Sequence, residues 1–193
     1  GTCAADGLCA TRCPVGIDTG VMMKRLRAAR QGETAGKVGH WVERHMGGAT
    51  AGVRLGLGAA RAISRLTGSS VLEKSTSGLR RLTGDRTPIW DRSMPRSASR
   101  LVRLAPVPDP SGLVCYLPSC VSRTMGTAVC DSEKRDLQQI TLSLLSKAGF
   151  EVVIPKRVEG LCCGMPFASK GLEGPARAAL EHIEEALWQA SEQ

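Results

Sequence analysis

The clustering of the cysteines constrains this chain more than any other feature of its sequence. Eight cysteines occur in 193 residues. A secreted disulfide scaffold has a higher density of cysteines in a shorter chain. Clustered cysteines without a signal-peptide pattern at the N-terminus are typical of metal ligands. The sequence therefore predicts metal sites rather than disulfides. The cysteines fall into three groups: Cys3, Cys9 and Cys13; Cys115, Cys120 and Cys130; and the adjacent pair Cys162 and Cys163.

The N-terminal group has the spacing of an iron–sulfur motif. Its register is that of the bacterial ferredoxin run C-x2-C-x2-C-x3-C-P, with Asp6 in place of the second cysteine. In such a run the closely spaced ligands surround one four-iron cluster, and the cysteine before the proline binds a neighbouring cluster. Structural zinc sites usually pair two C-x2-C elements, and the sequence has none. We expect Cys3, Asp6, Cys9 and Cys13 to bind iron–sulfur clusters, with zinc or a set of buried thiols as the alternatives.

Two interpretations of Asp6 remain open. Asp6-Gly7 is a favourable turn dipeptide, so the aspartate can be a turn former. Its carboxylate can also complete the cluster. A carboxylate is a harder ligand than a thiolate, so the iron that it binds would be more labile and have a shifted potential. The two roles are compatible. Asp18 or Thr19, just after the motif, is expected to cap the helix that follows.

The C-terminal part has the pattern of a small α/β unit. Apolar runs at 113–117 and 150–154 predict two strands, and residues 132–148 have the apolar spacing of a helix. The expected N-cap of this helix is Asp131 or Ser132. A strand, a crossover helix and a strand form a right-handed parallel unit. The helix face expected to be buried consists of Leu137, Ile140, Leu144 and Leu145.

The remaining cysteines follow the ends of these two strands. Ligand sites of open parallel sheets lie beyond the carboxyl ends of the strands. We therefore expect Cys120, Cys162 and Cys163 to form a metal site there, with Gly164 turning the backbone at the pair. The alternative is that the pair packs as two small buried side chains. Cys115 lies inside the first strand and is expected in the core, whereas Cys130 receives no role.

The charge is distributed unevenly along the chain. Residues 1–111 hold 18 Lys/Arg and 8 Asp/Glu, a net charge of +10, whereas residues 112–193 hold 8 and 10, a net charge of −2. A basic segment favours an acidic partner, lipid headgroups or phosphate. Aromatic residues make up 3% of the chain, which disfavours base stacking and hence single-stranded nucleic acid. No apolar run has the roughly 20 residues of a membrane span.

An arginine stripe lies within the basic segment. On a helix over 53–66, Arg54, Arg61 and Arg65 share one face. We expect this face to be solvated and the apolar face to be packed, with docking on a membrane surface or a partner as the alternative. Residues 68–111 are rich in Ser, Thr, Arg, Gly and Pro, and they are expected to form a linker or an irregular segment.

Two stretches resemble one known family. Residues 2–20, TCAADGLCATRCPVGIDTG, resemble the second cluster motif of the FAD-linked D-lactate dehydrogenases that carry a C-terminal iron–sulfur region. Residues 114–171, with CYLPSC and GLCCGMPFASKG, resemble the first cysteine-rich CCG repeat that follows it. The CCG repeat is shared with several iron–sulfur subunits, and the aspartate variant of the motif favours the lactate dehydrogenase type. The resemblance is weakest over 68–111.

The resemblance implies an α+β chain in three parts. Residues 1–35 would be the second half of a ferredoxin-type domain, 36–111 a helical and irregular basic connection, and 112–193 the first cysteine-rich CCG domain. The family's flavin domain, first ferredoxin run and second CCG repeat have no counterpart here. We therefore expect an internal piece of a longer polypeptide.

The resemblance also implies a function. In this family FAD oxidises a 2-hydroxy acid, and 4Fe-4S clusters pass the electrons to a cytochrome or quinone. The chain would be the electron-transfer part of such an enzyme, without catalytic residues of its own. Its partners would be the flavin domain and the respiratory acceptor. Its location would be cytoplasmic, with peripheral association at the inner face of the cytoplasmic membrane as an option. The alternative is a separate iron–sulfur subunit of the glycolate oxidase, anaerobic glycerol-3-phosphate dehydrogenase or heterodisulfide reductase type.

Overall fold

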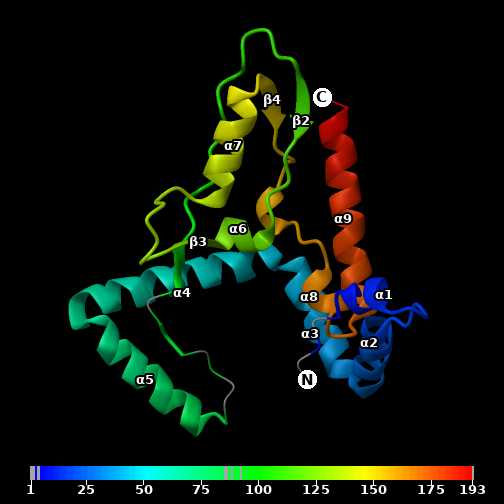
Figure 1. The fold of residues 1–193 in the computed structure, drawn as a ribbon, viewed down its shortest axis with the longest axis vertical. Coiled ribbons are helices and arrows are strands. Elements are labelled where there is room, and N and C mark those ends of the chain that lie inside the picture. Colours follow the sequence, from blue (N-terminus) through cyan, green and yellow to red (C-terminus); the bar gives the residue numbers. More distant parts are fainter. Residues whose placement is uncertain (1–2, 4, 85–86, 88, 92, 193) are drawn as a thin grey trace. The chain divides into compact units, whose positions relative to one another are not determined.

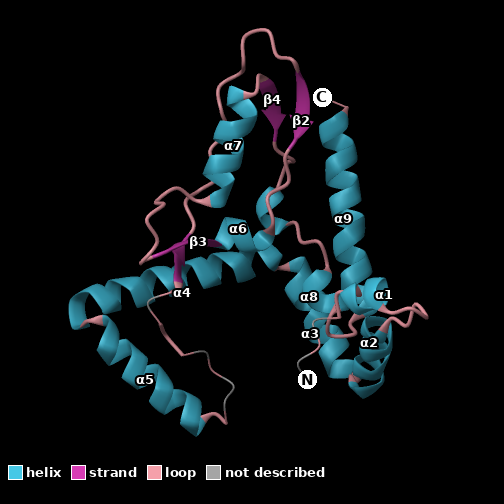
Figure 2. Ribbon diagram, viewed as in Figure 1, coloured by secondary structure: helices cyan, strands magenta, loops and turns pink. Residues whose placement is uncertain are grey.

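The computed structural model describes residues 3, 5–84, 87, 89–91 and 93–192. Helices predominate among them and the strands are short, so the expected α+β class is confirmed (Figures 1 and 2). The helices are α1 (Leu8–Arg12), α2 (Thr19–Arg30), α3 (Glu33–Arg44), α4 (Met46–Thr67), α5 (Ser69–Leu82), α6 (Cys120–Thr124), α7 (Leu137–Lys147), α8 (Met165–Ala168) and α9 (Glu173–Ser191), with a short 3-10 helix at Val158–Gly160. The strands are β1 (Pro95–Ser97), β2 (Gly112–Cys115), β3 (Met125–Ala128) and β4 (Phe150–Val153).

The chain divides into two compact units. Unit 1 combines residues 1–47 with residues 155–193, and unit 2 consists of residues 48–154. The N-terminal cysteine group and the Cys162–Cys163 pair therefore belong to unit 1, whereas Cys115, Cys120 and Cys130 belong to unit 2.

Unit 1 is a helical assembly in which α9 packs against α3 and α8 (Figure 1). The buried face of α9 includes Ala179 and Ile183. Nδ1 of His182 on α9 lies 2.8 Å from Oε1 of Glu43 on α3, and Glu43 is 6% exposed. The carboxylate of Asp18 accepts hydrogen bonds from the first-turn amides of α2, so the expected cap of this helix is confirmed.

Glycines allow the elements of unit 1 to approach closely. Gly171 has φ +80°, and a Cβ at this position would lie 2.4 Å from the backbone nitrogen of Ala28 in α2. Gly164 has φ +74°, and its Cβ would lie 2.5 Å from the carbonyl oxygen of Ala176 in α9. Both conformations favour glycine, and both spaces exclude a side chain. Residues 164–171 are therefore held against α2 and α9 by backbone contact.

Unit 2 contains the parallel strand pair that the sequence predicts. β2 pairs with β4 in parallel, from Gly112 opposite Phe150 to Cys115 opposite Val153. Helix α7 packs against β4, as expected of a crossover helix. A second pair, β1 and β3, is antiparallel and was not expected. The expectation of a linker or irregular segment over 68–111 is wrong for residues 69–82, which form α5.

The predictions for the start and for the buried face of α7 are wrong in part. The N-cap is Asp136 rather than Asp131 or Ser132. Leu137 and Leu144 are 65% and 66% exposed, whereas Gln138 and Leu142 are buried. The helix is therefore rotated relative to the face that its leucines suggest.

The buried carboxylate of Asp136 accounts for this arrangement. Asp136 is 0% exposed and accepts hydrogen bonds from the backbone N–H of Ser99, at 2.6 Å, and from Arg96, at 3.1 Å. It also forms a capping box with Gln139. A buried charge requires partners, so α7 takes the orientation that places Asp136 among these donors. The donors come from residues 37 and 40 positions away, beyond the reach of local patterns.

The arginine stripe of α4 also differs from the expectation. Arg54 is half-buried and donates a hydrogen bond to the carbonyl oxygen of Ala98, at 3.0 Å. Val53 and Ile63, on the apolar face, are 44% and 47% exposed. The expected solvated arginine face is therefore partly covered within unit 2. Among the described residues, no helix is long and apolar enough to cross a membrane.

We expect Asp136→Ala to lower the free energy of unfolding by about 3 kcal/mol, because it removes a helix cap and the carboxylate partner of Arg96. Urea unfolding followed by circular dichroism measures this change. Asp131→Ala is the matched control, since Asp131 is exposed in the preceding loop. Its effect should stay within about 0.5 kcal/mol, and an equal loss in both variants would contradict the assigned role.

The Asp136→Ala variant should also show that the stability contributed by Asp136 depends on pH. Burial alone would raise the pKa of Asp136, but hydrogen bonds from Ser99 and the ion pair with Arg96 lower it below its ordinary value. A carboxyl group with a lowered folded-state pKa stabilises the fold above its unfolded pKa and loses that effect as the pH falls through the folded pKa. The stability gap between wild type and Asp136→Ala should therefore narrow below about pH 4. A gap that stays constant into acid would contradict this account.

Candidate functional site

The N-terminal motif forms a loop, the short helix α1 and a second loop that leads into α2. Cys3 and Asp6 lie before α1, Cys9 lies on it, and Cys13 is its C-cap. Thr2 and Ala4 of the motif lie outside the described residues. Oδ1 of Asp6 accepts a hydrogen bond from the backbone N–H of Leu8, at 3.2 Å. The turn-forming role of Asp6 is therefore present, and its role as an iron ligand stays a prediction.

The thiol of Cys9 lies beside the start of α2. Its Sγ is 2.9 Å from Oγ1 of Thr19, the first residue of that helix. Hydrogen bonds from the Thr19 hydroxyl and then from the Thr19 backbone N–H lower the pKa of Cys9 below its usual value. Hydrogen bonds to a thiolate favour the charged form, so the cap of α2 and the ionisation of Cys9 depend on the same short segment.

The thiol of Cys13 faces backbone amides of the loop that follows it. Hydrogen bonds from the N–H groups of Ile17 and Val15, with a smaller contribution from Gly16, lower the pKa of Cys13. Backbone donors directed at a cysteine sulfur stabilise the thiolate, which is the form that binds metals. In iron–sulfur sites, hydrogen bonds to sulfur also tune the reduction potential.

Cys3 is held through its backbone. Its carbonyl oxygen accepts a hydrogen bond from Nη2 of Arg27, at 2.6 Å, and the side chain is half-buried. Nη1 of Arg27 donates to the carbonyl oxygen of Ser169. One guanidinium on α2 therefore joins the start of the cysteine motif to the segment that follows α8.

The Cys162–Cys163 pair lies just before α8. Gly164 adopts a left-handed conformation and is the N-cap of α8, so the expected turn at this glycine is confirmed. Cys162 is 4% exposed, whereas Cys163 is exposed. The burial of Cys162 agrees with the alternative in which the pair packs as two small buried side chains. The exposed thiol of Cys163, by contrast, is accessible to a metal ion.

The cysteines of unit 2 differ in their surroundings. Cys120 is half-buried at the first position of α6, which Ser119 caps by accepting from the N–H of Ser122 at 3.1 Å. Cys115 is exposed, so the expectation of a core position is wrong. The alternation along β2 places Leu113 and Cys115 on its exposed side. Partial burial still raises the pKa of the Cys115 thiol.

No group of three or more His, Cys, Asp or Glu side chains that could together hold a metal ion occurs within the described residues. Two of the four expected ligands, Cys9 and Cys13, nevertheless have lowered pKa values. Thiolates at these two positions are compatible with iron or with zinc. Sequence patterns did not identify Thr19 as the partner of Cys9, although its position after an N-cap aspartate is visible in the sequence.

Comparisons with protein-family models, curated proteins and solved structures find no match to this chain.

The reactivity of the thiols tests this geometry. Alkylation of the metal-free chain by iodoacetamide, followed by mass spectrometry across a pH series, should modify Cys9 at lower pH than Cys115, which is also exposed. Thr19→Val should shift the midpoint for Cys9 to higher pH, because the hydroxyl donor is lost. Cys13 serves as the internal control, since its donors are loop amides. An unchanged midpoint for Cys9 in Thr19→Val would refute the role of Thr19.

Proposed function

We propose that this chain is the iron–sulfur electron-transfer portion of a flavin-dependent 2-hydroxy acid dehydrogenase of the D-lactate dehydrogenase type. One observation carries the proposal: within a motif of ferredoxin register, the thiols of Cys9 and Cys13 are placed among hydrogen-bond donors that favour the thiolate. A thiolate is the ligand that iron–sulfur clusters require.

The four motif residues would hold iron in two sets. Cys3, Asp6 and Cys9 serve one 4Fe-4S cluster, and Cys13, which precedes Pro14, serves a neighbouring one. The clusters supply one-electron transfer when bound. The chain's own contribution is to keep the thiols ionised and to direct backbone N–H groups at the Cys13 sulfur, which tunes the reduction potential. Cys120 in unit 2 and the Cys162–Cys163 pair in unit 1 are proposed as further metal ligands.

The proposed partners follow from this role. Electrons would come from reduced FAD in a flavin domain and leave to a cytochrome or quinone. The excess of 18 Lys/Arg over 8 Asp/Glu in residues 1–111 favours a partner or membrane surface of negative charge. The proposed location is the cytoplasm, with peripheral association at the inner face of the cytoplasmic membrane as an option.

Anaerobic reconstitution with iron and sulfide tests the proposal. We expect the chain to bind iron and sulfide and to develop the broad visible absorption of iron–sulfur charge transfer. The bound amounts should fall short of complete four-iron clusters, because the motif offers at most three ligands to one cluster and one to the other. Cys9→Ser and Cys13→Ser should each lower the bound iron, whereas Cys115→Ser, an exposed cysteine of unit 2, should leave it unchanged.

Two results would count against this function, and a third would contradict the ligand assignment alone. The first is zinc, rather than iron, in the chain purified without added metal. The second is iron binding that Cys115→Ser reduces as much as Cys9→Ser does, which indicates nonspecific thiol binding. The third is a stable, stoichiometric four-iron spectrum, which contradicts the assignment of Cys13 to a different cluster.

A further inference from the structure

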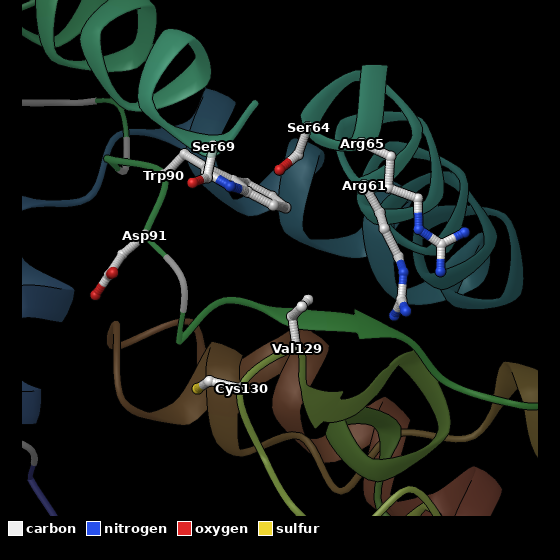
Figure 3. A pocket seen from close by; sticks show the side chains of 8 residues that line it. All are labelled: Arg61, Ser64, Arg65, Ser69, Trp90, Asp91, Val129 and Cys130. Atoms are coloured by element: carbon white, nitrogen blue, oxygen red, sulfur yellow. The ribbon is translucent and has the colours of Figure 1, made fainter. Parts of the chain in front are cut away.

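Unit 2 contains a cavity of about 310 Å³ that the electron-transfer role does not use. It lies among the C-terminal half of α4, the start of α5, the segment at Trp90 and the residues that follow β3 (Figure 3). Its volume is at the lower end of the range for small-molecule sites. The cavity is separate from the N-terminal cysteine motif, which belongs to unit 1.

One wall of the cavity is cationic. Arg61 and Arg65 lie one turn apart on α4, and Figure 3 shows both side chains extending in the same direction, toward Val129. Neither guanidinium has an ion pair or hydrogen bond to any residue that the structure describes. Arg54 of the same helix, by contrast, is bonded to the carbonyl oxygen of Ala98. The donors of Arg61 and Arg65 are therefore available to a bound anion.

The start of α5 borders the cavity beside Trp90 (Figure 3). Ser69, the first residue of α5, lines the cavity, and α5 has no side-chain cap. First-turn amides of a helix have no intrahelical partner and carry the positive end of its dipole. The hydroxyl groups of Ser64 and Ser69 also line the cavity. Guanidinium groups, hydroxyls and a helix N-terminus together form a suitable environment for phosphate or carboxylate.

The apolar part of the lining consists of Trp90 and Val129. The indole of Trp90 extends along the cavity toward Ser64 in Figure 3, and Val129 lies across from it. The backbone N–H of Trp90 donates to Oγ1 of Thr76 on α5, at 2.9 Å, which fixes this segment against the helix. The carboxylate of Asp91 also belongs to the lining, and Figure 3 shows it directed away from the two guanidinium groups. An indole offers a stacking surface for a ring.

We propose that this cavity binds a small organic anion in which a phosphate or carboxylate is attached to a flat ring. The charged group is bound by Arg61 and Arg65, and the ring stacks on Trp90 beside the start of α5. Two guanidinium groups without described partners supply the charge selectivity. The indole and Val129 supply the preference for a ring over a bare anion. This site extends the function of the chain beyond electron transfer to the recognition of a soluble ligand.

Calorimetric titration of the full chain with phenyl phosphate tests the proposal, with tryptophan fluorescence as a second readout. We expect saturable binding and quenching, and weaker binding of inorganic phosphate and of uncharged benzyl alcohol. Arg61→Gln and Arg65→Gln should each weaken phenyl phosphate binding by about tenfold or more, since each removes charge-assisted hydrogen bonds. Trp90→Phe should remove most of the quenching.

Arg81→Gln is the matched control, because Arg81 is an exposed arginine of α5 outside the cavity. It should bind phenyl phosphate as wild type does. Thermal melting by circular dichroism verifies that each variant is folded. The proposal is overturned by a lack of saturable binding at millimolar phenyl phosphate, or by equal weakening in Arg81→Gln. Binding of phosphatidylserine vesicles without binding of phenyl phosphate would also overturn it, since the anion recognised would then be a lipid surface.

Discussion

Close backbone contact at Gly171 fixes α2 against the segment that follows α8 in unit 1. The unit also buries apolar side chains, among them Leu161, Phe167 and Ile183, but at Gly171 the two segments approach where no side chain intervenes. A Cβ on Gly171 would lie 2.4 Å from the backbone nitrogen of Ala28 in α2. Arg27, the neighbour of Ala28, bonds to the carbonyl oxygens of Cys3 and Ser169. Because α2 is fixed in this way, its N-terminus presents Thr19 to the cysteine motif at a defined position.

Unit 2 depends on a buried charge instead. The carboxylate of Asp136 joins the start of α7 to the backbone at Ser99 and to Arg96. These contacts fix the rotation of α7 about its axis. They therefore expose Leu137 and Leu144, which the apolar spacing of the helix predicts to be buried. Unit 1 thus combines buried apolar side chains with close backbone packing, whereas unit 2 depends on a satisfied buried ion.

Local features of the sequence predicted local features of the structure. The cap at Asp18, the turn at Gly164 and the parallel pair of β2 and β4 depend on neighbouring residues or on general rules of topology, and all three are present. The network at Asp136 and the partial burial of Arg54 depend on residues dozens of positions away, so periodicity alone could not reveal them. For the candidate site, spacing identified the cysteines but not the hydroxyl donor or loop amides that surround them.

The central claim is that the N-terminal cysteines bind iron through thiolate sulfur. X-ray absorption at the iron edge, on the chain loaded anaerobically with Fe(II) and without added sulfide, tests it most directly, since any sulfur bonded to iron must then belong to the protein. We expect sulfur neighbours of iron in the wild type, and fewer of them when Cys9 and Cys13 are both changed to serine, since the other proposed thiol ligands remain. Iron bonded to oxygen and nitrogen alone in the wild type would contradict it.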